Sequence, residues 1–114
     1  MKIHILREPP TEQQVREMLE AIPDYIKLAV DVERGVLAGG GGLHADCEEV
    51  LLDDGSRQDN IWGADWEPET REVQFGSLIN IRPRQGNRSM LIESRALRER
   101  VEAVVRRLLE VRET

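Results

Sequence analysis

Apolar and polar residues alternate in several short runs along the chain, which is the pattern of strands with one buried face. The runs cover residues 2–7, 25–33, 36–38, 61–66, 73–82 and 89–93. Residues 73–82 form the longest of them, with Val73, Phe75, Ser77, Ile79 and Ile81 on one side. The sequence therefore predicts five or six strands, with the longest over residues 73–82.

Three other stretches have the 3.6-residue period of amphipathic helices. The first follows Thr11, which forms a capping-box pattern with Gln14, and Pro23 is expected to end it. The second runs from residue 43 to Gly55 and is only about two turns long, so a strand through residues 45–52 remains an alternative. The third begins after Ser94 and is the longest.

The order of these elements predicts an α+β fold. We expect residues 1–114 to form a single domain with a mostly antiparallel sheet of five or six strands and three helices, the C-terminal helix being the longest. A strictly alternating strand and helix order, which a parallel doubly wound sheet needs, is absent. We also expect the helices to cover one face of the sheet.

The amino-acid composition favours a cytosolic protein over a membrane or secreted one. The chain is 39% hydrophobic and 33% charged, and no apolar run approaches the ~20 residues that cross a bilayer. The first residues lack the apolar core of a signal peptide, so we expect a cytosolic protein without membrane contact. A lone cysteine, Cys47, cannot form an internal disulfide, which agrees with a reducing compartment.

Charge is distributed unevenly along the chain, whose net charge is -6. Residues 1–72 contain 7 Lys/Arg and 17 Asp/Glu, whereas residues 73–114 contain 9 and 5. This division favours an acidic and a basic face, which suits contact with a second copy of the chain as much as an anionic ligand. An acidic chain is a poor general binder of nucleic acid.

Four consecutive glycines, Gly39 to Gly42, precede the second helix. Backbone N–H groups at a helix N-terminus bind phosphate, but no Lys-Ser/Thr pair follows these glycines and the third glycine of a dinucleotide fingerprint is missing. We interpret the run as a tight passage from strand to helix.

A polar cluster with one of the two histidines follows the glycines. His44 and Glu48 would share one face of a helix, whereas His44, Asp46 and Glu48 would share one face of a strand. We take His44, Asp46 and Glu49 as candidate catalytic groups, with helix capping or surface pairing as the alternative. No metal motif is complete, so we assign no metal site, and any cofactor is unknown. Cys47 lies on the apolar stripe and is expected to be a buried thiol.

A basic, amide-rich segment covers residues 80–89. Its candidate ligand-binding residues are Arg82, Arg84, Asn87 and Arg88, because guanidinium groups bind carboxylates and phosphates through paired hydrogen bonds. The alternative is that these arginines pair with the acidic helix or with a neighbouring subunit.

Two of the motifs that identify a resemblance are Gly41-Gly42-Leu43-His44-Ala45-Asp46-Cys47 and Asn80-Ile81-Arg82-Pro83-Arg84-Gln85-Gly86-Asn87-Arg88-Ser89. From about residue 24 to the C-terminus, the chain resembles a family of short bacterial proteins, frequent in cyanobacteria, whose function is unknown. The resemblance implies a stand-alone bacterial domain. It implies no reaction, ligand or partner.

These observations favour a binding or regulatory domain that associates into a homo-oligomer. In this hypothesis the acidic and basic patches meet and form a polar cleft for an anionic small molecule or a partner protein. The first alternative is a hydrolase-like enzyme in which His44 acts with Asp46, Glu48 or Glu49, with or without a metal ion. The second is a nucleic-acid-processing protein that uses the basic C-terminal part.

Overall fold

A five-stranded antiparallel sheet forms the centre of the structure, a computed structural model that describes residues 1–110. The strand order is β1-β3-β2-β4-β5, and each neighbouring pair is antiparallel. The strands are β1 (His4–Leu6), β2 (Ile26–Asp31), β3 (Val36–Gly39), β4 (Ile61–Glu67) and β5 (Glu72–Gln74). The helices are α1 (Glu12–Met18), α2 (His44–Asp53) and α3 (Arg95–Leu109), with short 3-10 turns at Gln58–Asn60, Leu78–Asn80 and Pro83–Gln85. The predicted α+β class, the antiparallel sheet and the longest C-terminal helix are confirmed.

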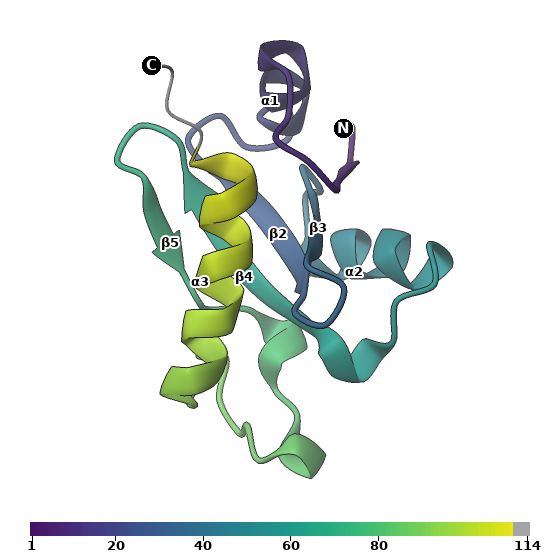
Figure 1. The fold of residues 1–114 in the computed structure, drawn as a ribbon, viewed down its shortest axis with the longest axis vertical. Coiled ribbons are helices and arrows are strands. Elements are labelled where there is room, and N and C mark those ends of the chain that lie inside the picture. The colour runs from purple at the N-terminus through teal and green to yellow at the C-terminus, as the bar shows by residue number, and fades with distance from the viewer. Residues whose placement is uncertain (111–114) are drawn as a thin grey trace.

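Helices lie on both faces of the sheet (Figure 1). Trp62, Ala64 and Trp66 of β4 point into the larger core, which α1 and α3 cover. Ile61 of the same strand points into a smaller core on the other face, which α2 covers with Cys47 and Leu51. The expectation that all helices share one face is therefore wrong. Both sides of the central strands are apolar, so each side needs its own cover.

Local sequence signals account for the helix boundaries. Thr11 and Gln14 form the predicted capping box at α1, and the Ser94 hydroxyl accepts a hydrogen bond from the Leu97 N–H at α3. Helix α1 ends at Met18, several residues before Pro23. No helix among residues 1–110 has the length and apolar character needed to span a membrane.

The glycine run forms a close-packed passage between β3 and α2. Gly40 has a φ of +107°, and a Cβ atom there would lie 2.4 Å from the Lys2 carbonyl oxygen. A Cβ on Gly41 would lie 3.0 Å from the Cys47 sulfur. Both positions exclude a side chain for reasons of packing, as the sequence interpretation required.

Residues 76–93 depart most from the sequence prediction. The strand predicted over residues 73–82 is confined to β5, and the closing strand predicted over residues 89–93 is reduced to one bridge between Gly76 and Leu91. Both predictions are wrong because side chains replace the ladder in this segment. The Ser77 hydroxyl accepts a hydrogen bond from the Ile79 N–H and starts a 3-10 turn. The side chain of Asn80, at the end of this turn, binds strand β4 directly.

Candidate functional site

Two buried asparagines organise residues 76–93, and the first of them holds this segment against the sheet. Asn80 is completely buried, and its Oδ1 accepts from the Gly63 N–H at 2.8 Å. Its Nδ2 lies 3.1 Å from each of the carbonyl oxygens of Gly63, Phe75 and Met90, so its two hydrogens are shared among three acceptors. The amide thus takes the hydrogen bonds that a neighbouring strand would make with β4. A Cβ on Gly63 would lie 2.5 Å from the Ser77 Cβ, so glycine is needed for this approach.

Asn87 has a similar role farther along the segment. Its Nδ2 donates to the carbonyl oxygens of Asn80, Ser89 and Leu91, and its Oδ1 accepts from the Glu93 N–H. Asn87 is 4% exposed, so its amide is directed inward. Its polar atoms bind the chain itself, which is a structural role for a residue that the sequence offered as a ligand-binding candidate.

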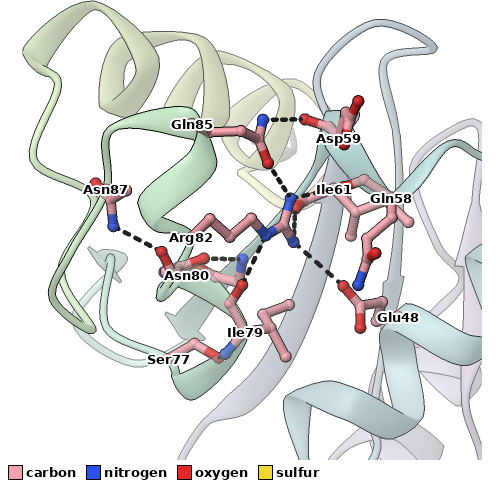
Figure 2. Close-up of polar contacts among 11 residues, drawn as sticks. Glu48, Gln58, Asp59, Ile61, Ser77, Ile79, Asn80, Arg82, Gln85 and Asn87 are labelled. Atoms are coloured by element: carbon pink, nitrogen blue, oxygen red, sulfur yellow. Dashed lines mark hydrogen bonds and ion pairs between the residues drawn. The ribbon is translucent and has the colours of Figure 1, made fainter.

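Arg82 joins four segments of the chain (Figure 2). Its guanidinium donates to the carbonyl oxygens of Gln58, Ile61 and Ile79, to the Gln85 amide oxygen, and to Glu48 on α2 at 3.2 Å. These five hydrogen bonds match the five N–H groups that an arginine carries. The guanidinium carbon also lies 4.7 Å from the centroid of the Trp62 ring. Burial lowers the pKa of Arg82, while Glu48 and Asp59 oppose that shift.

The acidic and basic patches therefore meet at the contact between Glu48 and Arg82. Next to it lies a cavity of about 440 Å³, which we call the Arg82 cavity. Its lining includes Glu48, Asp59, Arg82 and Arg84. The cavity thus contains as many carboxylates as guanidinium groups. All the donors of the Arg82 guanidinium already make hydrogen bonds within the protein.

His44 forms a second polar centre at the first turn of α2. Its Nε2 lies 2.8 Å from Asp65 Oδ1 and 3.1 Å from the Ala64 carbonyl oxygen, both on β4. The side chains of His44 and Asp65 are 11% and 19% exposed. Because both neighbours of Nε2 are acceptors, this nitrogen carries a proton, and Nδ1 of the neutral ring is left with a free lone pair.

A cavity of about 350 Å³ lies beside this pair, and we call it the His44 cavity. Its polar lining comes from Tyr25, Lys27, His44, Asp65 and Ser77. Its apolar lining includes Leu43, Ala45, Leu78, Ile79 and Met90. Leu78 and Ile79 also line the Arg82 cavity, so a narrow apolar ridge separates the two hollows.

The other candidate residues lie apart from this centre. Asp46 and Glu49 make no hydrogen bond with His44 within residues 1–110, and Glu49 is exposed on α2. Arg84 lines the Arg82 cavity, and Arg88 is exposed in the segment that Asn87 anchors. No group of three or more potential metal ligands occurs in the part of the chain that the structure describes.

Cys47 is a buried thiol on the apolar side of α2, as its position in the sequence indicated. Desolvation raises its pKa to about 11, so it is protonated at neutral pH. This protonation state does not suit a nucleophile.

Sequence reasoning missed Lys27 and Asp65. They face each other on β2 and β4, where residue 27 pairs with residue 65. One signal could have identified them: each is a charged residue flanked by apolar residues in its strand, on the face opposite the main core. Their placement beside His44 depends on strand pairing, which alternation alone does not provide.

Comparison with known proteins supplies a family. Residues 4–108 match the model of a family described as "Protein of unknown function (DUF5674)". The chain belongs to the DUF5674 family. The match confirms the expected membership in a family of unknown function, whereas occurrence in bacteria stays a prediction. No curated protein and no solved structure matches the chain.

Proposed function

We propose that this DUF5674 chain is a ligand-binding domain, and that its ligand is a small organic anion with an apolar part, held in the His44 cavity. The observation that carries the proposal is Lys27. Lys27 lines the cavity, and within residues 1–110 its ammonium takes part in no ion pair and no side-chain hydrogen bond. An anion in the cavity would supply the missing partner.

The positive potential of the cavity has a further source. Helix α2 begins at the cavity wall, and its N-cap residue, Leu43, offers no side-chain acceptor to the N–H groups of the first turn. Asp65 is the one carboxylate in the lining, and it already accepts from His44.

The Arg82 cavity suits an anion less well. Glu48 and Asp59 would repel it, and Arg82 has no donor to spare. The walls also differ, because those of the His44 cavity include Leu43, Leu78 and Met90. Its volume of about 350 Å³ lies in the common range for small-molecule sites and equals roughly a dozen water molecules. An anion with a short aliphatic or aromatic group fits both its charge and its size.

Matched probes test this proposal. Isothermal calorimetry would compare benzoate and butyrate with the uncharged benzamide and butyramide. We expect the carboxylates to bind more tightly, and Lys27→Met to weaken their binding about tenfold, which corresponds to ~1.4 kcal/mol. Lys2 is the other lysine of the chain and pairs with Glu17 away from the cavity, so Lys2→Met is a control with the same change in charge. Equal binding of acids and amides, or equal loss in the two variants, would refute the proposal.

A second candidate function rests on the geometry of His44. Asp65 and the Ala64 carbonyl fix the ring with its Nε2 proton directed inward, which leaves Nδ1 available as a general base. A hydrolase that acts on activated esters is the corresponding activity. The test is the turnover of p-nitrophenyl esters by the wild type, His44→Ala and Asp65→Asn, with folding verified by circular dichroism. Unchanged turnover in His44→Ala would exclude this role.

A further inference from the structure

Most of the large hydrophobic side chains that the chain leaves in solvent gather in one region. Seven such side chains occur among residues 1–110, and five of them come from the start of α2 and from residues 76–91. These five are Leu43, Leu78, Ile81, Met90 and Leu91, and we call them the Leu78 face. Leu43, Leu78 and Met90 line the His44 cavity, while Leu78 and Ile81 line the Arg82 cavity, so these four are neighbours around the two cavities. Leu91 follows Met90 directly in the chain. An exposed apolar surface of this kind is typical of an interaction site.

Leu78 is the centre of this face and is 73% exposed. It lies in a 3-10 turn, where Ser77 caps the turn and the completely buried Asn80 ties it to β4. The turn is thus capped on one side of the leucine and anchored to the sheet on the other. Its exposure is built into the fold, and its side chain is presented in a fixed place before any partner arrives.

The surroundings of Leu78 are self-complementary. The leucine forms part of the ridge between the two cavities, so a protruding apolar side chain stands directly beside a hollow with apolar walls. A two-fold axis through the face would place the Leu78 of each copy in the hollow of the other. Such an isologous contact needs only surface that one chain already contains.

Charges on the two sides of the face complement each other in the same arrangement. Glu49 is exposed on α2, one turn after Ala45 of the His44 cavity, and Arg84 is exposed in the lining of the Arg82 cavity. Neither makes an ion pair in the part of the chain that the structure describes. A two-fold contact brings the Arg84 of one copy toward the Glu49 of the other, twice. The acidic first part and the basic last part of the sequence agree with this pairing.

We propose that the Leu78 face binds a second copy of this chain in a two-fold dimer. The proposal goes beyond ligand binding and does not depend on it. Leu78 of the second copy would occupy the hollow assigned to the anion, so the dimer is the state of the protein without that ligand. Sedimentation velocity of the full chain, from low to high micromolar concentration, would show the mass rising from the monomer value of 13.0 kDa to twice that value. Leu78→Asp is expected to weaken association at least tenfold. Leu52→Asp is the matched control, because Leu52 is exposed on α2 and lines neither cavity.

A charge exchange tests the orientation. Arg84→Glu and Glu49→Arg should each weaken self-association, since each variant alone places like charges together at both contacts. An equimolar mixture should recover it as a heterodimer, because both contacts then join opposite charges. Circular dichroism of every variant separates lost association from lost folding. A wild type that is monomeric at all concentrations, an equal effect of Leu78→Asp and Leu52→Asp, or a mixture that stays monomeric would overturn the proposal.

Discussion

Replacing Asn80 with alanine should remove a large part of the stability of the protein. The buried amide makes four contacts with backbone groups of Gly63, Phe75 and Met90. Alanine removes the partner of the Gly63 N–H and carbonyl, whereas the carbonyls of Phe75 and Met90 keep backbone N–H donors. With about 1 kcal/mol for each hydrogen bond, and more for a group left buried and unpaired, the loss is about 3 to 5 kcal/mol. Domains of this size are stable by only about 5 to 15 kcal/mol, so the variant should fold but with a much reduced margin.

Urea denaturation followed by circular dichroism measures this loss. For a slope of about 2 kcal/mol per molar urea, the transition midpoint should fall by roughly 2 M. Asn60→Ala is the control, because the Asn60 side chain makes no hydrogen bond within residues 1–110 and its change should cost less than about 0.5 kcal/mol. If Asn80→Ala denatures together with that control, the amide does not hold the segment and the reasoning fails.

An isosteric change at the same residue sharpens the test. Asn80→Asp keeps the shape of the side chain but places a carboxylate against three carbonyl oxygens. The folded state then raises the pKa of the new carboxyl group, so stability is lost as the pH rises through that pKa. The variant should therefore be less destabilised at pH 5 than at pH 8, and the opposite trend would contradict this account.

Other predictions concern packing, reactivity and pH. Gly63→Ala should destabilise by about 1 to 3 kcal/mol because its Cβ would meet the Ser77 Cβ at 2.5 Å, whereas Gly76→Ala, with nothing within 4 Å, should be nearly neutral in urea denaturation. Cys47, whose pKa is raised to about 11 by burial, should resist a disulfide reagent at pH 8 until urea is added, and rapid labelling of the native protein would contradict its burial. Hydrogen bonds, above all from the Arg88 N–H and then from Ser89, lower the pKa of the Glu93 carboxyl from its usual 4.5. The contribution of Glu93 to folding stability is therefore present above pH 4.5 and lost as the pH falls. The stability difference between the wild type and Glu93→Gln should shrink in acid. A difference that stays constant with pH would exclude this linkage.

Sequence patterns predicted the regular elements because their signals are local. The capping residues Thr11 and Ser94 and the periodic apolar positions of α3 fix their helices within a few residues. The alternation in residues 73–82 was misleading for a physical reason. Ile79 and Phe75 do pack inward, but Ser77 and Asn80 bind the backbone with their own side chains, and the ladder ends at Gln74.

The candidate site was predicted only in part. Sequence reasoning identified His44, and its interpretation of Arg82 as a partner of the acidic helix agrees with the contact to Glu48. The pairing of His44 with Asp65 and the place of Lys27 depend on the register of β2 and β4, which joins residues far apart in the chain. Nothing in the local pattern carries that information.

The two tryptophans of β4 lie beside different parts of the molecule. The guanidinium of Arg82 lies over Trp62, and that of Arg106 on α3 lies 5.9 Å from the centroid of the Trp66 ring. An indole responds in emission wavelength and intensity to a cation at its face and to water. Variants that keep only one tryptophan would therefore carry an intrinsic optical probe for residues 76–93 in one case and for the C-terminal helix in the other. Stopped-flow fluorescence of the two would reveal which part of the domain detaches first during unfolding.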